Sequence, residues 1–182
     1  TTAGWQVACS HFGSAERRSM PMRRGGCCWF RPDGVAASKR FGDGDKKSDL
    51  EALTAYIVGQ SRGHTVEIKL QHPAEKAAYE TGKSLFFYRA GPHDFSCASC
   101  HGESGKRIRL QSLPGLLEKK DAQFAFTTWP GYRVSQGELR TLEWRLADCF
   151  RQQRLPQLGY GSPAAVALVM FMAVNANGGK MD

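Results

Sequence analysis

The run Cys97-Ala98-Ser99-Cys100-His101 constrains this chain more than any other stretch, because it matches the pattern Cys-x-x-Cys-His. In that pattern, the two thiols can form thioether bonds to the vinyl groups of one haem, and the adjacent imidazole can ligate the iron. A structural zinc site would need a second ligand pair, and a redox dithiol normally follows a strand in a βαβ pattern. The motif therefore predicts one covalent haem c, held by Cys97 and Cys100, with His101 as the proximal ligand.

Charge and hydropathy argue against two broad classes of function. The 182 residues carry a formal net charge of +8, but nine of the 25 Lys and Arg residues precede Ser48, with only four acidic residues. The rest of the chain has no basic helix or aromatic-interleaved patch, so we expect no nucleic-acid binding. The longest apolar run, 164–174, is shorter than the roughly 18 to 20 residues that a membrane span requires. We expect no membrane span, and a periplasmic location, because haem c is attached outside the bacterial inner membrane.

The first 47 residues lack the periodicity of a folded unit. Apolar residues in 1–47 recur at neither 3.6 nor 2 positions, and Arg, Gly, Cys and Ser are abundant. This composition predicts an irregular or disordered segment of unclear origin, without a functional role. A degenerate small domain and a shifted reading frame are the alternative explanations.

Helical patterning begins at Ser48. Ser48 and Glu51 match a Ser-x-x-Glu capping box, and the apolar residues that follow share one helical face. This helix is expected to end at Gly63, a residue suited to a left-handed C-cap. Alternating apolar residues over 64–70 predict an extended, half-buried connector. A second helix is predicted over 73–89, because a proline suits its first turn, and its aromatic end is expected beside the haem.

Two further helices are predicted after the haem motif. Residues 102–120 form a Gly- and Lys-rich stretch with little periodicity, which predicts a loop. Ser135 and Glu138 match another capping box, and the apolar stripe that follows predicts a helix. A closing helix is predicted over 163–176, since Ser-Pro precedes it and Asn-Gly-Gly follows it. This order of elements predicts an all-α fold with a class I cytochrome c domain over 73–182.

The identity of the second axial ligand of the iron distinguishes two possible functions. An electron-carrying cytochrome uses a methionine there, which raises the reduction potential. Met170, Met172 and Met181 are available by type, although the first two lie in an apolar run that favours core packing. Cys149 is the alternative, because Arg145 precedes it by one turn on the same helical face. A guanidinium there lowers the pKa of a thiol and can bind a sulfur oxyanion, so the residues alone leave both ligands open.

In combination, these motifs resemble those of the A subunit of the SoxAX cytochrome of bacterial thiosulfate oxidation. The resemblance covers about residues 48–178 and is more specific than the haem motif alone. The matching stretches are Leu50-Glu51-Ala52-Leu53-Thr54-Ala55-Tyr56, Gln60-Ser61-Arg62-Gly63, Ser96 to Gly102, Gly105-Lys106-Arg107, Pro130, Tyr132, Arg133, Leu142, Arg145, Leu146, Cys149 and Tyr160-Gly161-Ser162-Pro163.

The resemblance implies roles for individual residues and segments. It implies that Cys149 is the distal haem ligand and active-site residue, often carried as a persulfide, and that Arg145 holds the substrate anion. It implies that 48–72 is the last helix of a degenerate N-terminal cytochrome c-like domain plus a linker, and that 73–182 is the C-terminal haem c domain. The single haem motif matches the mono-haem branch of that family, and the chain is expected to be incomplete at both ends.

The resemblance also implies an enzyme with partners. Its members are subunits of an L-cysteine S-thiosulfotransferase, which oxidatively couples thiosulfate to a cysteine of a carrier protein. The implied partners are a small c-type cytochrome, called the X subunit, and the sulfur-carrier YZ protein complex. The alternative is a plain periplasmic electron-transfer cytochrome with a methionine ligand, which makes no bond.

Overall fold

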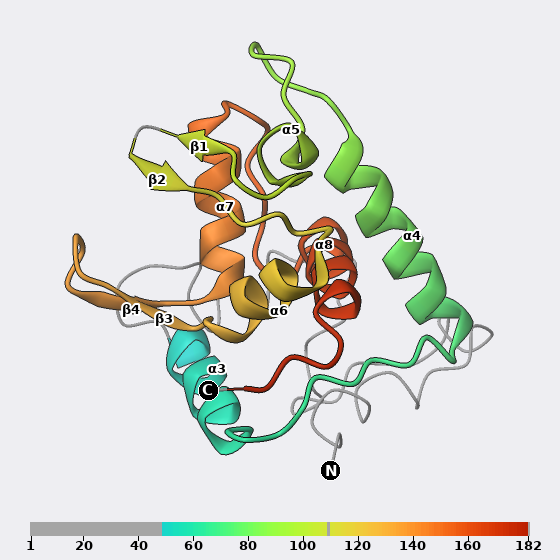
Figure 1. Cartoon of the computed structure of the whole chain (residues 1–182), viewed down its shortest axis with the longest axis vertical. Helices are drawn as coiled ribbons and strands as arrows, with labels where there is room; N and C mark the ends of the chain where they lie inside the picture. Colours follow the sequence, from blue (N-terminus) through green and yellow to red (C-terminus); the bar gives the residue numbers. More distant parts are fainter. Residues whose placement is uncertain (1–48, 109, 182) are drawn as a thin grey trace, which may run out of the picture.

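The computed structural model describes residues 49–108 and 110–181, with the backbone alone for Asp49 and Leu50. The irregular segment predicted over 1–47 and Ser48 of the predicted capping box therefore lie outside the described residues. Helices surround α8, and two small hairpins lie at one side (Figure 1). The elements in chain order are α3 (Asp49–Gln60), α4 (Pro73–Phe87), α5 (Cys97–His101), β1 (Arg107–Ile108), β2 (Gln111–Ser112), α6 (Lys119–Thr127), β3 (Gly131–Arg133), β4 (Glu138–Arg140), α7 (Leu142–Gln152) and α8 (Pro163–Asn175).

The helices predicted over 73–89 and 163–176 are confirmed as α4 and α8. Each begins at a proline that follows a capping side chain, His72 before α4 and Ser162 before α8. Each of these side chains accepts a backbone N–H of the first helical turn, which would otherwise have no partner. Helix α4 ends two residues earlier than predicted, because Tyr88 already has an extended backbone.

The hydrophobic core lies where α4 packs against α8. The two helices approach so closely at Gly82 that an added Cβ would lie 2.0 Å from the carbonyl oxygen of Ala167. Phe86 from α4 and Leu168 and Phe171 from α8 are almost fully buried at this crossing. The rings of Phe86 and Phe171 stack at a tilt, with centroids 5.1 Å apart. The crossing forms the rigid base against which the haem motif packs.

The haem motif forms the short helix α5, whose start is fixed by two serines. Ser96 and Ser99 make a reciprocal capping box, in which each side chain accepts the other residue's backbone N–H. The segment after the motif is anchored by Asp121, which accepts the Ser104 hydroxyl at 2.6 Å and the Gly115 N–H at 2.9 Å. The loop prediction for this segment missed the hairpin β1–β2 and the start of α6 at its end. A hairpin with two-residue strands and a single helical turn are too short to show a hydrophobic period in the sequence.

The helix predicted from Ser135 starts later than expected. The strands β3 and β4 pair antiparallel, with Arg133 opposite Glu138, and Gly137 in the turn has a left-handed φ of 68°. The predicted capping box at Ser135 and Glu138 is therefore wrong, because both residues belong to a hairpin. Helix α7 instead begins after Thr141, whose hydroxyl accepts a first-turn N–H.

The extended connector after α3 is confirmed and pairs with the C-terminal end of the described chain. Gly63 takes the predicted left-handed conformation, with φ 77°. Val66 donates its N–H to the carbonyl of Gly179 at 2.8 Å. The Asn177 side chain contacts both the N–H and the C=O of Ile68, at 2.7 and 3.0 Å. These bonds hold the connector beside the segment that follows α8.

The main elements agree with the predicted helical class. Two antiparallel hairpins, β1–β2 and β3–β4, are additions that the sequence patterns did not predict. Within 49–108 and 110–181, no helix has the length and apolar character needed to cross a membrane.

Candidate functional site

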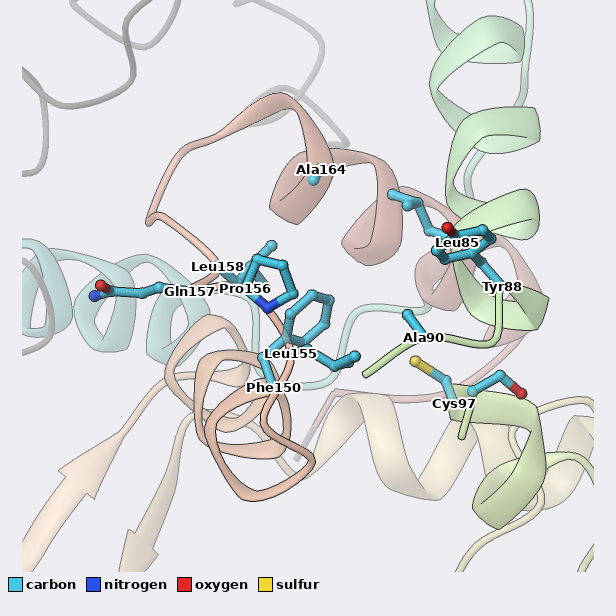
Figure 2. A pocket seen from close by; sticks show the side chains of 11 residues that line it. Leu85, Tyr88, Ala90, Cys97, Phe150, Leu155, Pro156, Gln157, Leu158 and Ala164 are labelled. Carbon is cyan, nitrogen blue, oxygen red and sulfur yellow. The ribbon is translucent and has the colours of Figure 1, made fainter. Parts of the chain in front are cut away.

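The thiols of the haem motif lie on α5 beside an apolar pocket. Cys97 and Cys100 are free and half-buried. Burial raises the pKa of Cys97 to about 11, which indicates surroundings that disfavour charge. The Cys97 side chain contributes to the wall of a pocket of about 260 Å³ (Figure 2). The pocket is bounded by the ends of α4 and α7 and the starts of α5 and α8, through Leu85, Tyr88, Ala90, Ser96, Cys97, Phe150, Leu155, Pro156, Gln157, Leu158 and Ala164.

His101 is oriented as a metal-binding imidazole. Its Nδ1 lies 3.0 Å from the carbonyl oxygen of Pro114, and because a carbonyl only accepts, Nδ1 is the protonated nitrogen. Nε2 is then the nitrogen with a free lone pair, the arrangement found in metal-bound histidines. Burial lowers the pKa of His101, so the neutral ring that ligates a metal is favoured. Two thiols, one oriented imidazole and an apolar wall together fit haem c.

The same residues do not fit a zinc site. Among residues 49–108 and 110–181, no group of three or more His, Cys, Asp or Glu side chains is arranged to hold a metal ion. The zinc alternative needs four such ligands around one ion.

Helix α7 carries the two other predicted site residues, Cys149 and Arg145. Cys149 is half-buried, and it interacts electrostatically with Cys97 and Cys100, so the structure brings it to the haem motif. Burial raises the pKa of the Cys149 thiol, and the Arg145 guanidinium opposes this rise. Arg145 Nη1 donates to Asp148 at 3.2 Å, and the Arg145 charge also lowers the pKa of His101.

Arg133 is a site residue to which the sequence analysis assigned no role. It is half-buried on β3, and its charge lowers the pKa of Cys149, as that of Arg145 does. No ion pair found among the described residues includes Arg133, whereas Arg145 is paired with Asp148. Only the β3–β4 hairpin brings Arg133 back to α7, and the part of that hairpin from Ser135 onward was predicted as the start of a helix. Its only sequence signal was its place in the family resemblance.

The three candidate methionine ligands lie on or after α8. Met172 is buried in the hydrophobic core, as the apolar run predicted, and Met170 is half-buried on the same helix. Met181 is fixed at the connector, where its backbone N–H donates to His64 at 2.9 Å.

Comparison with known proteins agrees with a cytochrome c domain. The family model of the SoxA/TsdA cytochrome c domain matches residues 81–181, more than half of the chain. The chain is 46% identical over 157 residues to the L-cysteine S-thiosulfotransferase subunit SoxA of Hydrogenophilus thermoluteolus, covering 85% of this chain and 58% of that relative. It is 39% identical over 147 residues to a SoxA subunit of Hydrogenobacter thermophilus, covering 79% of this chain and 55% of that relative.

A solved structure agrees as well. The crystal structure of SoxXA from P. pantotrophus superimposes with a TM-score of 0.65 at 27% identity, covering 82% of this chain and 55% of that chain. The chain spans little more than half the length of the curated relatives it matches. The matched domain implies a covalently bound haem c. On the match over residues 81–181, the chain belongs to the SoxA/TsdA cytochrome c family.

Proposed function

We propose that this chain is the haem c subunit of an L-cysteine S-thiosulfotransferase that oxidatively couples thiosulfate to a carrier-protein cysteine. The observation that carries the proposal is the pairing of Cys149 with Arg145, one turn apart on α7 and within electrostatic range of the haem motif. The SoxA relatives bear the name of this enzyme.

In the proposed reaction, Arg145 binds the sulfonate end of thiosulfate through charge-assisted hydrogen bonds. Arg133 adds a second positive charge on the hairpin side of Cys149. Joining the outer sulfur of thiosulfate to a thiol forms one S–S bond and releases one proton and two electrons. Haem c, when bound, supplies a one-electron acceptor beside Cys149. Cys149 would hold the haem iron opposite His101 and would accept the outer sulfur of thiosulfate, and it would carry a persulfide when that sulfur stays on the thiol after the S–SO₃ bond is hydrolysed to sulfate.

The proposal includes partners and a compartment. The solved neighbour is a complex named SoxXA, which supports a small c-type cytochrome X subunit as the protein that carries the electrons away. The carrier cysteine belongs to the YZ sulfur-carrier complex, and thiosulfate is the anionic substrate. The compartment is the periplasm, where haem c is attached. Helix α3 with the connector up to residue 72 is proposed to be the end of a degenerate N-terminal cytochrome c-like domain.

The test is the ligand field of the ferric haem, measured by electron paramagnetic resonance on the full chain loaded with haem. Changing Cys149→Ser should remove the low-spin signal of a thiolate ligand and abolish thiosulfate transfer, because serine offers the iron no thiolate. A chain with a methionine ligand would keep its signal, since thiolate and methionine ligands give different fields. Arg145→Ala should keep the signal and weaken thiosulfate turnover, since it removes an anion contact and leaves the ligand in place.

Met170→Ala is the matched control in the same domain. It should keep the parental signal if Cys149 is the ligand. A parental spectrum in Cys149→Ser together with a changed spectrum in Met170→Ala would replace the enzyme with the plain electron-transfer cytochrome.

A further inference from the structure

Arg140, at the end of β4, is the centre of a buried polar cluster that joins three elements. Its Nε donates to Gln136 at 3.1 Å in the hairpin turn, and its Nη2 lies 2.8 Å from the Glu138 carboxylate on β4. Its Nη1 donates to Glu51 on α3 at 3.4 Å. The guanidinium carbon lies 5.0 Å above the ring of Trp144 on α7. One side chain therefore contacts α3, the β3–β4 hairpin and α7.

The burial of this cluster indicates that its geometry is fixed. The side chains of Arg140 and Glu51 are only 7% and 9% exposed. A buried charge is tolerated only when it is paired and hydrogen-bonded, so the guanidinium keeps its partners in one arrangement. Three of the four buried polar residues in the described part of the chain lie at this junction, namely Glu51, Arg140 and Thr141.

The junction is linked through the backbone to both arginines near Cys149. The Arg140 cluster holds the turn and β4, and β4 pairs with β3, with Gly131 opposite Arg140 and Arg133 opposite Glu138, so the position of Arg133 depends on the cluster through this pairing. On α7, Trp144 immediately precedes Arg145. A shift of the hairpin against α7 would move Arg133 away from Cys149, whereas Arg145 shares a helix with Cys149 and would move with it.

We infer that Arg140 is a positioning residue that holds Arg133 at Cys149, and that its bond to Glu51 makes anion binding at Cys149 depend on α3. The inference rests on the proposed function for the identity of the anion. It assigns α3 a part in the haem site, although no residue of α3 lines the described pocket.

The experiment compares variants of the full, haem-loaded chain by two readouts. The first is the thiosulfate dissociation constant, from the change in the ferric haem absorption band at fixed ionic strength. The second is the ratio of the alkylation rates of Cys149 by anionic iodoacetate and by neutral iodoacetamide, read from the peptide that contains Cys149. Ligation of the thiolate by iron slows both reagents alike and therefore cancels in this ratio. This ratio measures the local positive charge without requiring thiosulfate to bind.

The variants are Arg140→Lys and, in case that change impairs folding, the isosteric Glu51→Gln on α3. Both should weaken thiosulfate binding about tenfold, which is the size of one lost charge-assisted hydrogen bond. The alkylation ratio should fall several-fold in both, and the resonance signal of the thiolate ligand should stay parental. His72→Ala, which removes the capping side chain at the start of α4, far along that helix from the pocket, is the control, and it should lower thermal stability without changing either readout.

A double-mutant cycle separates positioning from a general loss of stability. Arg133→Gln should weaken thiosulfate binding by itself, and adding Glu51→Gln to it should cause little further loss, because both act through Arg133. Parental values in Glu51→Gln, or additive losses in the double variant, would overturn the inference. A parental chain that does not respond to thiosulfate would overturn the proposed function, and the alkylation ratio would then decide the inference alone.

Discussion

Replacement of Gly82 by alanine tests the close approach of α4 and α8, on which the placement of the haem motif depends. A Cβ at Gly82 would lie 2.0 Å from the Ala167 carbonyl oxygen, 2.6 Å from its carbonyl carbon and 2.9 Å from Cβ of Phe171. The nearest atoms are backbone atoms, which cannot rotate away. The helices would have to separate by about 1.4 Å to bring the 2.0 Å approach to an ordinary contact of 3.4 Å.

The magnitude follows from two opposing terms. Alanine is favoured over glycine inside a helix by about 0.8 to 1 kcal/mol. Overpacking a well-packed core typically costs about 1 to 3 kcal/mol, and more when the obstacle is backbone. Because the clash at Gly82 is with a carbonyl group, we expect the upper end of that range, and a net loss of about 2 kcal/mol or more in the free energy of unfolding.

Gly59→Ala in α3 is the matched control, because an added Cβ there has no neighbour within 4 Å. The preference of alanine over glycine inside a helix then acts without a steric clash, and it should raise the free energy of unfolding by up to about 1 kcal/mol. Thermal unfolding of the haem-loaded chain, followed by circular dichroism, gives about 2 to 8 °C per kcal/mol in domains of this size range. Gly82→Ala should therefore lower the midpoint by at least about 4 °C, while Gly59→Ala leaves it unchanged or raises it. A parental midpoint for Gly82→Ala, or equal shifts in both variants, would refute the close crossing.

Three further predictions concern the haem, the N-terminal segment and pH. Mass spectrometry should show the added mass of one haem on the parental chain, and this mass should be lost when Cys97 and Cys100 are changed to Ser; an unmodified parental mass would contradict the haem assignment. Deletion of residues 1–47 should leave the haem spectrum and the thermal midpoint nearly unchanged, and a fall of more than about 4 to 8 °C would show that the segment is packed. Burial raises the pKa of Glu143 above 4.5, so the folded state binds the extra proton and stability falls as pH rises through this window. Glu143→Gln should therefore gain stability relative to the parental chain between about pH 4 and 7, and a constant difference across that range would contradict the raised pKa.

The sequence predicted those helices whose ends are marked by local chemistry. Helices α4 and α8 start at prolines, and Gly63 ends the turn after α3 with a left-handed backbone. These signals act within a few residues, so they are visible without knowledge of the fold. The haem motif belongs to the same class, because its chemistry is contained in five consecutive residues.

The sequence could not predict contacts that depend on long-range packing. The serine and glutamate pattern at Ser135 and Glu138 is compatible with a helix start and with a hairpin turn, and the left-handed Gly137 belongs to the hairpin. Glu51 contacts Arg140, which is 89 positions away on β4, and no local sequence pattern indicates this contact. Arg133 was missed as a site residue for the same reason, since only the hairpin returns it to α7.

Under the proposed function, the charges around Cys149 give two arginines different roles at one thiol. Burial raises the pKa of Cys149, and the adjacent Asp148 carboxylate acts in the same direction. Arg145 lowers that pKa, but it shares its charge with Asp148, which also accepts hydrogen bonds from Arg151 at 2.7 Å. The ion pairs that Asp148 makes with Arg145 and Arg151 therefore fix the orientation of Arg145. The Asp148 carboxylate also reduces the positive electrostatic potential that Arg145 produces at a bound anion. Arg133 has no such pair among the described residues, so in the proposed reaction its charge is offset less than that of Arg145 when the doubly negative thiosulfate approaches. In the proposed reaction, α7 alone would supply the thiol and the guanidinium that orients the anion, and the β3–β4 hairpin would add the positive charge that attracts the anion to them.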